Sequence, residues 1–380
     1  MRILHVDHSP VLGGAERSVL ELARAQRQRG HRVVVAVGGS GPFTTELERA
    51  SIPWKDLHWP ERFLATSQFA GPMQLLAGIP GLASASARLR ALVSRFEPDV
   101  VQAHTRKSQV VAAFALAGTG VPLVWHLRDD LPTRRALLAL VSRALGRANH
   151  AVALSEWLAR SYTTSRALPR SRRIGVVPSG VDPRPLSVLS TPWLNGERDP
   201  VIGFVGQVAA WKAPHLLIEA AEQLEGTRAS FLIIGSVWFP AAESGYGRWL
   251  GQRLAGSPAR ERVEWLPATS QPAEAFTQFD VLVHTSVLPE PFGRVLVEAM
   301  IARRPIVALE RGSARELLDH GSAVFVERPD GMSIAAAVTA LIEHPDRARR
   351  LAERAAARAA AFSPANVAQR MEREYDVLRP

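Results

Sequence analysis

Short apolar segments alternate with amphipathic segments along most of this chain. In the first half, strand-like runs occupy residues 3–6, 32–37, 100–103, 123–126, 151–154 and 175–177. Helical patterns lie between several of them, at residues 15–30 and 82–96. Short, fully apolar runs separated by helices are typical of parallel strands that are covered on both faces. The sequence therefore predicts layered parallel α/β structure.

The alternation is interrupted between residues 182 and 200. This stretch is dense in proline, glycine and charge, as expected of an interdomain linker. A second series of strand-like runs follows, at residues 201–206, 230–235, 263–266, 281–284 and 305–309. Because 380 residues are too many for one ordinary core, we expect two Rossmann-like domains. Their predicted ranges are 1–185 and 201–362, with a linker at 186–200 and a final helix at 363–380.

The composition narrows the class of protein further. The chain has no cysteine, which excludes disulfides and thiolate metal sites and gives no sign of an oxidising compartment. Asp7 and His8 end the first apolar run too soon for a signal peptide. No run approaches the roughly 18 apolar residues of a membrane-spanning helix. We therefore expect a cytoplasmic protein.

Charge is unevenly distributed along the chain. Residues 1–190 hold 25 basic and 13 acidic side chains, whereas residues 191–380 hold 21 and 23. The basic half could attract nucleic acid, a phosphorylated acceptor or an anionic membrane surface, or be a solvated arginine-rich surface. No nucleic-acid motif is present, so nucleic acid is not an expected partner. Peripheral association with the inner face of a membrane stays open, and the glycine- and proline-rich residues 67–87 read as a surface loop or one that touches lipid.

Two carboxylates bracket a predicted helix start, at Glu290 and Glu298. Pro291 suits the first turn of a helix, Gly293 lets a ligand approach the backbone, and the N–H groups from Phe292 to Val295 form a site for phosphate. The carboxylates would lie up to roughly 12 Å apart along the axis, which suits a nucleotide sugar. One glutamate could bind hexose hydroxyls and the other ribose hydroxyls, with the diphosphate between them. A capped helix with solvated acids is the alternative.

These residues resemble the retaining glycosyltransferases of family 4, which have the GT-B architecture. The resemblance covers nearly the whole chain, and its landmarks occur in order at residues 13–16, 104, 125–129, 178–182, 206–212 and 290–298. It implies two Rossmann-like domains facing across a cleft, and a C-terminal helix that crosses back to the N-terminal domain. By the same resemblance, the N-terminal domain binds the acceptor and the C-terminal domain binds the nucleotide sugar.

Candidate residues in the first half are Gly13, Gly14 and His126. The glycines follow the first strand and precede a helix, where backbone N–H groups can approach phosphate, although a tight turn alone is the alternative. His126 ends an apolar strand, where a side chain can project from the carboxyl edge of a sheet. In family 4 the matching histidine contacts the transferred sugar; a structural histidine is the alternative. His104 and Asp129 are weaker candidates.

Lys212 is one of three lysines, against 43 arginines, which favours a compact ammonium for a diphosphate oxygen over a surface lysine. The family usually offers both an arginine and a lysine in this loop, and Gln207 stands where the arginine is expected. Glutamine cannot neutralise phosphate, so more of the charge stabilisation would fall on Lys212, helix N–H groups and Arg294. Residues 312–316 match a family segment only loosely, and Arg304 replaces a glycine; packing explains both equally well.

The resemblance implies a metal-independent, retaining glycosyltransferase. It would move a hexose-type sugar from a nucleoside-diphosphate-sugar donor to a glycan, lipid-linked or small-molecule acceptor in polysaccharide or glycoconjugate synthesis. Glu290 would orient the sugar, Glu298 would hold ribose, and the donor phosphate would help to deprotonate the acceptor. Two adjacent acids, Asp129 and Asp130, fall short of a coordination shell, so no metal and no cofactor are expected. The alternatives are a GT-B sugar-nucleotide 2-epimerase and a catalytically silent sugar-nucleotide-binding protein.

Overall fold

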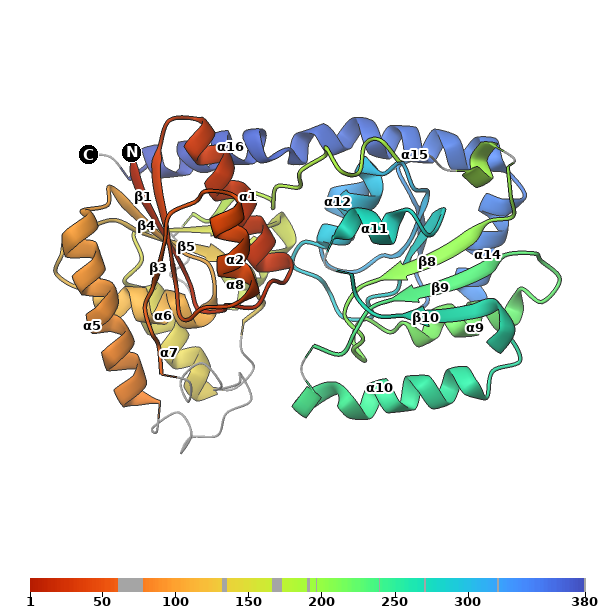
Figure 1. Ribbon diagram of the computed structural model, residues 1–380, viewed down its shortest axis with the longest axis horizontal. Helices are drawn as coiled ribbons and strands as arrows, with labels where there is room; N and C mark the ends of the chain where they lie inside the picture. Colours follow the sequence, from red (N-terminus) through yellow and green to blue (C-terminus); the bar gives the residue numbers. More distant parts are fainter. Residues whose placement is uncertain are drawn as a thin grey trace. The chain divides into compact units, whose positions relative to one another are not determined.

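The computed structural model describes residues 1–60, 78–131, 135–165, 173–189, 192–195, 197–238, 240–269, 271–319 and 321–378. The chain divides into two compact units, one of Met1–Gly180 with Pro364–Pro380 and the other of Val181–Ser363. Each unit holds one parallel sheet interleaved with helices (Figure 1). The predicted α/β class is thereby confirmed.

The sheet of the first unit has the strand order β3-β2-β1-β4-β5-β6-β7. Its strands are β1 (Arg2–Asp7), β2 (Arg32–Val37), β3 (Trp54–Asp56), β4 (Val100–Ala103), β5 (Leu123–Leu127), β6 (His150–Ala153) and β7 (Gly175–Val176). All pairs of neighbours are parallel. The central strands β4, β5 and β6 are buried along their whole length, which explains why their sequences are continuous apolar runs.

The helices of the first unit are α1 (Gly14–Gln28), α2 (Pro42–Arg49), α5 (Ile79–Phe96), α6 (Arg106–Ala115), α7 (Arg135–Leu145), α8 (Glu156–Thr164) and α16 (Pro364–Asp376). Figure 1 shows α16, the end of the chain, running beside α1. Val367, Met371 and Tyr375 of α16 are buried in one hydrophobic core with Val19 and Leu22 of α1. The C-terminal helix therefore returns to the N-terminal unit, as predicted.

The sheet of the second unit has the order β10-β9-β8-β11-β12-β13, again with parallel neighbours. Its strands are β8 (Val201–Val205), β9 (Ser230–Ile234), β10 (Val263–Leu266), β11 (Val281–His284), β12 (Ile306–Leu309) and β13 (Val324–Val326). Gly203 in β8 allows close packing, because a Cβ there would lie 2.3 Å from the ring of Phe279. Strands β8 to β12 agree with the five apolar runs predicted from the sequence, whereas β13 was not predicted.

The α-helices of the second unit are α9 (His215–Gln223), α10 (Pro240–Ala255), α11 (Pro272–Phe276), α12 (Arg294–Ile301), α13 (Ala314–Leu318), α14 (Gly331–Ile342) and α15 (Pro345–Ala359). Short 3-10 helices cover Pro192–Asn195, Arg260–Arg262 and Ala360–Phe362. Asp330 caps α14 by accepting a hydrogen bond from the Ser333 N–H at 2.7 Å. The helix is thus stabilised at its first turn by the side chain that its sequence places there.

Some segments differ from their predicted ranges. The first unit ends at Gly180 instead of residue 185, and the predicted linker at 186–200 groups with the second unit. The Val181 N–H donates to the Phe362 carbonyl at 2.9 Å, which ties the start of the second unit to its end. Residues 61–77 of the predicted loop lie outside the described residues, but from Ile79 onward the chain is helical in α5, so the loop prediction was wrong there.

Candidate active site

The candidate residues of the second unit follow the carboxyl ends of two adjacent strands. β8 and β11 are neighbours in the sheet, although β9 and β10 lie between them in sequence. Such a switch point leaves a crevice at the carboxyl edge of a parallel sheet, where ligands bind in open α/β folds. The segment after β8 leads to Lys212 and the segment after β11 leads to Glu290. The structure brings these two predicted catalytic residues into contact.

Glu290 is the centre of a small, buried polar cluster. Its Oε1 accepts hydrogen bonds from Lys212 Nζ, from Ser286 Oγ and from His284 Nε2, the last at 2.7 Å. The residue is only 8% exposed. Burial alone would raise the pKa of this carboxyl, but the charges of Lys212 and His284 and their hydrogen bonds hold it well below its usual range. Glu290 is therefore an ionised carboxylate in a fixed orientation.

His284 and Ser286 were not predicted from the sequence as site residues. Both lie at the end of the apolar run at residues 281–284: His284 is the last residue of β11, and Ser286 lies two positions beyond it. Polar side chains at the carboxyl end of a central strand were the signal that could have identified them. These two residues supply two of the three donors that hold Glu290.

Gly312 and Ser313 fix the backbone beneath Glu290. Gly312 has φ +58°, and a Cβ there would lie 2.4 Å from the Glu290 carbonyl oxygen. The Ser313 N–H donates to that carbonyl at 3.1 Å, and Ser313 Oγ donates to the Phe292 carbonyl at 2.7 Å. Although these residues match the family segment only loosely, they position the loop that carries the carboxylate.

Lys212 is mostly buried rather than displayed on the surface, since its side chain is 12% exposed. Its Nζ lies 4.5 Å from the centroid of the Trp211 ring, within the range of a cation–π contact. Thr285 Oγ1 donates to the Lys212 carbonyl at 2.6 Å, which ties the loop after β8 to the loop after β11. Gln207 is half-buried in the same loop as Lys212.

The helix that follows Glu290 begins later than predicted. α12 starts at Arg294, and Gly293 precedes it with φ +77°. Pro291 therefore lies before the helix instead of in its first turn, which corrects the expectation from the sequence; the left-handed backbone at Gly293 separates the two. Phe292 is buried and Val295 is half-buried in the first turn. The helix N-terminus thus lies within four residues of the Glu290 carboxylate.

The second acid of the motif also has a partner. Arg294 Nε donates to Glu298 Oε1 at 2.9 Å, across one turn of α12. Both side chains are mostly buried, at 14% and 8% exposure. The residue predicted to assist phosphate binding and the residue predicted to hold ribose therefore contact each other in this structure.

In the first unit, the predicted glycine turn is present but one of its N–H groups is used internally. α1 begins at Gly14, and the N–H of Gly13 donates to Glu16 Oε2 at 2.9 Å. Burial and the neighbouring carboxylate of Asp7 raise the pKa of Glu16 to about 8. Gly14 is exposed. At neutral pH the turn is consequently closed by a protonated carboxyl group.

His126, the predicted sugar contact, lies at the carboxyl end of β5 and is 1% exposed. It belongs to a buried polar cluster that also contains His5, His104 and Gln102. Burial and the charge of Arg128 lower the pKa of His126 well below its usual range, and the Val177 carbonyl only partly opposes that shift. His126 is therefore a neutral imidazole at physiological pH.

His5 and Gln102 were not singled out from the sequence. In the parallel register His5 of β1 lies opposite Gln102 of β4, and His104 lies two residues further along. His126 of β5 stands on the same face, because Gln102 lies opposite Val124. Polar residues at matching positions of adjacent buried strands were the available signal. Asp129, the other weak candidate, offers its carbonyl to the Tyr162 hydroxyl at 3.0 Å.

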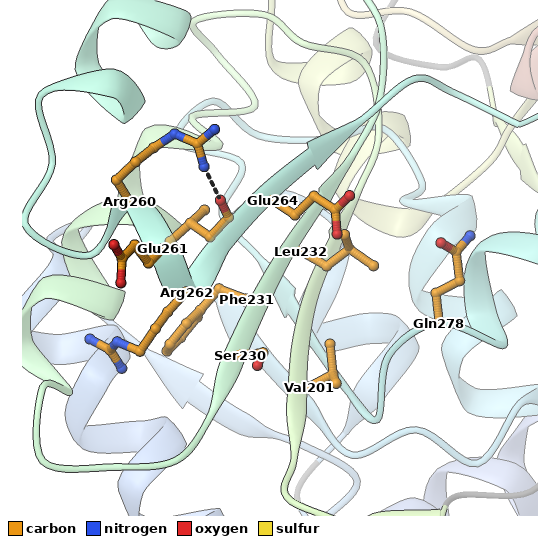
Figure 2. Close-up of a pocket in the computed structure, with 10 residues that line it drawn as sticks. Val201, Ser230, Phe231, Leu232, Arg260, Glu261, Arg262, Glu264 and Gln278 are labelled. Carbon is orange, nitrogen blue, oxygen red and sulfur yellow. Dashed lines mark hydrogen bonds between the residues drawn. The ribbon is translucent and has the colours of Figure 1, made fainter.

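The hollow in Figure 2 lies away from these residues. It is lined by the first residues of three strands, Val201 of β8, Ser230 of β9 and Val263 of β10, and so lies at the amino edge of the second sheet. Arg262, which borders it, donates to the carbonyls of Ala221 and Leu224 at the end of α9. Its charged residues thus serve the fold, and this hollow is not the candidate site.

The described residues contain no group of three or more histidine, aspartate or glutamate side chains placed to hold a metal ion. None of the described helices combines the length and the apolar character that crossing a membrane would require.

Comparison with known families covers nearly the whole chain. The family described as Glycosyltransferase Family 4 matches residues 12–184, and that described as Glycosyl transferases group 1 matches residues 190–358. A D-inositol 3-phosphate glycosyltransferase from Xylanimonas cellulosilytica is 30% identical, over 92% of this chain and 87% of its own length. A glycogen synthase from Mycobacterium tuberculosis is also 30% identical, over 93% of this chain and 89% of its own length.

Solved structures agree with this assignment. The Anabaena protein HepE in complex with UDP-glucose is similar with a TM-score of 0.82 and 26% identity, covering 99% of this chain and 100% of that one. Sucrose-phosphate synthase from Thermosynechococcus elongatus has the same fold, with a TM-score of 0.81 at 17% identity, over 99% of this chain and 98% of that one. With two matching family halves and full-length relatives, this chain belongs to glycosyltransferase family 4 and has the GT-B fold.

Proposed function

We propose that this protein is a retaining glycosyltransferase that moves a hexose-type sugar from a nucleoside-diphosphate-sugar to an acceptor held by the N-terminal unit. UDP-glucose is the first donor to test, because the similar HepE was solved with UDP and with UDP-glucose. The proposal rests above all on one observation. Glu290 is a buried, ionised carboxylate held by three donors at the carboxyl edge of the second sheet, beside the start of α12.

In the proposed reaction, the bond between the sugar C1 and the leaving phosphate oxygen breaks, and the acceptor oxygen forms a bond to C1 on the same face. The acceptor proton passes to an oxygen of the departing diphosphate. Lys212 would stabilise the charge on the diphosphate, and the negative Glu290 would orient the sugar and stabilise positive charge that develops on its ring. Both roles are electrostatic and depend on fixed positions, which the buried cluster supplies.

Lys212 and Glu290 form an ion pair with each other in this structure. A donor diphosphate that engages Lys212 would draw the ammonium away from Glu290, while His284 and Ser286 would keep the carboxylate in place. The carboxylate of Glu290 would therefore stay held by two of its three donors when Lys212 binds the diphosphate. Glu298 would bind ribose hydroxyls after parting from Arg294, which would then be available to the phosphate.

A catalytically silent sugar-nucleotide-binding protein is the second candidate, and Gln207 is the observation that favours it. Glutamine replaces an arginine that the family usually provides, and one positive charge near the diphosphate is missing as a result. An oriented carboxylate at Glu290 would serve sugar binding in either protein, so release of the nucleoside diphosphate is the measurement that separates them.

The acceptor is proposed to be anionic or presented at a membrane surface. Residues 1–190 carry 12 more basic than acidic side chains, and electrostatic attraction of that size favours an anionic partner. The name of the 30% identical inositol phosphate enzyme specifies a phosphorylated acceptor for that relative. The same proposal places the enzyme in the cytoplasm, at the inner face of the membrane. This location agrees with the lack of cysteine.

The test is transfer from a panel of UDP-, GDP-, ADP- and TDP-sugars to neutral and phosphorylated acceptors, with and without EDTA. We expect nucleoside diphosphate release that depends on the acceptor, a product with the donor's anomeric configuration by NMR, and activity that survives EDTA. Acceptor-independent release would identify the 2-epimerase, and tight binding without release would identify the silent binding protein. An inverted product would refute retention, and activity restored only by Mn²⁺ would refute metal independence.

A further inference from the structure

Six buried side chains of the first unit, His126 among them, form a ring of close polar contacts. They come from β1, α1, β4, β5 and α16, together with the residue that follows β4, and none is more than 1% exposed. The members are His5, Gln26, Gln102, His104, His126 and Tyr375. A ring of this kind is the polar centre of a domain core, where each donor must face an acceptor.

The contact with Arg128 shows which atoms of His126 and Gln102 donate a hydrogen bond and which accept one. Its Nη2 lies 3.4 Å from His126 Nδ1, and a guanidinium can donate but never accept. His126 Nδ1 must therefore carry the lone pair. The Gln102 group at 3.1 Å from the same Nδ1 is consequently its NH₂.

The rest of the ring follows from that first assignment. The Gln102 carbonyl accepts from the Tyr375 hydroxyl, whose oxygen accepts from the Gln26 NH₂ at 3.1 Å. The Gln26 carbonyl in turn accepts from His5 Nε2 at 2.7 Å, and His5 Nδ1 accepts from His104 Nε2 at 2.8 Å. In this assignment His104 donates through Nε2, so its Nδ1 also carries a lone pair, and the 3.3 Å contact between His104 Nδ1 and His126 Nδ1 is not a hydrogen bond. Reversing Gln102 would place a second acceptor, its carbonyl, against His126 Nδ1.

The histidines of the ring carry one proton each. Burial lowers the pKa of His5 to about 4, and burial with the charge of Arg128 lowers the pKa values of His104 and His126 well below their usual range. Because His126 Nδ1 is an acceptor, the single proton of its ring is on Nε2. Nε2 is buried, and among the described residues no partner meets ordinary hydrogen-bond geometry with it, although the Val177 carbonyl lies near enough to His126 to oppose the fall in its pKa.

We propose that Tyr375, Gln102 and Gln26 are positioning residues which, together with Arg128, hold His126 as the tautomer with its proton on Nε2, and so present an N–H donor to the sugar. The use of that donor rests on the function proposed above; the assignment of the tautomer does not. The C-terminal helix thus contributes to the chemistry of the first unit through one hydroxyl group, in addition to its packing against α1. None of the three positioning residues needs to contact the substrate.

The test is NMR of the full-length protein labelled with ¹⁵N-histidine. Two-bond ¹H–¹⁵N correlations distinguish the two neutral tautomers, and His126→Asn identifies the His126 signals among the 11 histidines. We expect the wild type to show the Nε2–H pattern alone for His126 at pH 7. An Nδ1–H pattern in the wild type would overturn the proposal without any variant of the ring.

Tyr375→Phe removes the hydroxyl that orients Gln102 while keeping the buried ring. Gln102 can then turn its carbonyl toward His126 Nδ1, against only the longer, 3.4 Å contact of Arg128, so we expect an Nδ1–H population to appear at His126. We expect kcat to fall about tenfold to a hundredfold, the scale found for outer partners of metal-ligating histidines, with the donor KM nearly unchanged. Tyr162→Phe is the matched control, because Tyr162 is equally buried in the same unit and its hydroxyl bonds only the Asp129 carbonyl outside the ring. The control should change neither the tautomer nor kcat.

The outcomes distinguish the tautomer of His126 from its proposed contact with the sugar. A folded Tyr375→Phe protein that retains the Nε2–H tautomer alone overturns the positioning role. A changed tautomer with unchanged kcat supports the assignment of the ring and refutes the proposed contact of His126 with the sugar. A fall in kcat in the Tyr162→Phe control as large as in Tyr375→Phe would show that both act through stability, and would overturn the role of Tyr375 in catalysis.

Discussion

The two units have the same architecture, but each holds a buried glutamate whose pKa is shifted in the opposite direction to the other. Glu16 in the first unit and Glu290 in the second are 7% and 8% exposed. Beside Glu16 lies another carboxylate, Asp7, and the pKa is raised to about 8. Around Glu290 lie Lys212 and His284, and the pKa is held well below its usual range. Equal burial therefore gives a neutral acid in one unit and an anion in the other, and the neighbouring charges decide which.

The same contrast extends to the surroundings of each residue. Apart from Arg128, the side chains that contact His126 in the first unit are neutral, and they fix the direction of hydrogen bonds. The second unit surrounds Glu290 with donors that stabilise a charge. A network of neutral groups fixes which nitrogen of His126 carries the proton, whereas a cluster of charged groups keeps Glu290 ionised. Substitutions in the two units should consequently fail in different ways.

The largest effect is expected from Glu290→Gln. The change removes the charge while nearly conserving shape, and it leaves Lys212 without its anionic partner. We expect kcat to fall about a hundredfold or more, the scale of one preorganised electrostatic contact. Steady-state kinetics and the melting temperature should be measured together. Glu222→Gln is the control. Like Glu290, Glu222 accepts hydrogen bonds from a basic side chain and a serine, here Arg253 and Ser257, but it lies on α9 and outside the candidate site. Turnover of Glu290→Gln within about threefold of the control would remove Glu290 from catalysis.

The next effect concerns the cation of the same cluster. Lys212→Ala should cost about 2 kcal/mol or more in kcat/KM, because the diphosphate loses its buried ammonium. Lys212→Arg should recover only part of that loss, since a planar fork does not replace a compact charge beside Trp211. Lys55→Ala, on an exposed residue of the first unit, is the control. Wild-type kinetics for Lys212→Ala would mean that this buried lysine serves the fold alone.

A pH-dependent effect should distinguish the glutamate of the first unit. The folded state holds the Glu16 proton more tightly than the unfolded chain, so that contribution to stability is complete below about pH 4.5 and is lost as the pH rises through about 8. Glu16→Gln cannot ionise. We expect its free energy of unfolding, relative to wild type, to gain about 4 kcal/mol between pH 5 and pH 9.

Urea unfolding across this pH range measures the difference directly. Glu97→Gln, at an exposed position of the same unit, serves as the control. A difference between Glu16→Gln and wild type that stays constant with pH would show that Glu16 is ionised throughout, and the contrast between the two units would disappear.

The smallest effect concerns long-range charge. If the basic first unit attracts an anionic acceptor, the KM for a phosphorylated acceptor should rise as salt shortens the Debye length from about 10 Å at 0.1 M to about 3 Å at 1 M. The corresponding free energy is about 1 kcal/mol or less. The KM for a neutral acceptor, measured in parallel, should change less. Equal salt dependence for both acceptors, together with no binding to anionic vesicles at low salt, would contradict an anionic or membrane-presented acceptor.

The sequence was sufficient for most of the regular structure. The apolar runs at residues 100–103 and 281–284 coincide with β4 and β11, because strands buried along their whole length leave a continuous apolar signature. The start of α12 was misplaced for a local reason. Pro291 fits a first turn, but the left-handed backbone at Gly293 postpones the helix to Arg294, and a preference for one conformation does not reveal which neighbour overrides it.

By itself, then, the sequence determined the α/β layering, the family and the identity of Glu290, Lys212 and His126 as candidates, because each depends on residues close together in the chain or on a recognisable motif. Only the tertiary structure decided the ionisation of Glu16 and Glu290 and the ring through His126. Those properties arise from residues far apart in sequence, such as His5, Gln102 and Tyr375, which the parallel register and the return of α16 bring together. Electrostatics and hydrogen bonds act over a few ångströms in space, and the number of residues between two groups does not fix that distance.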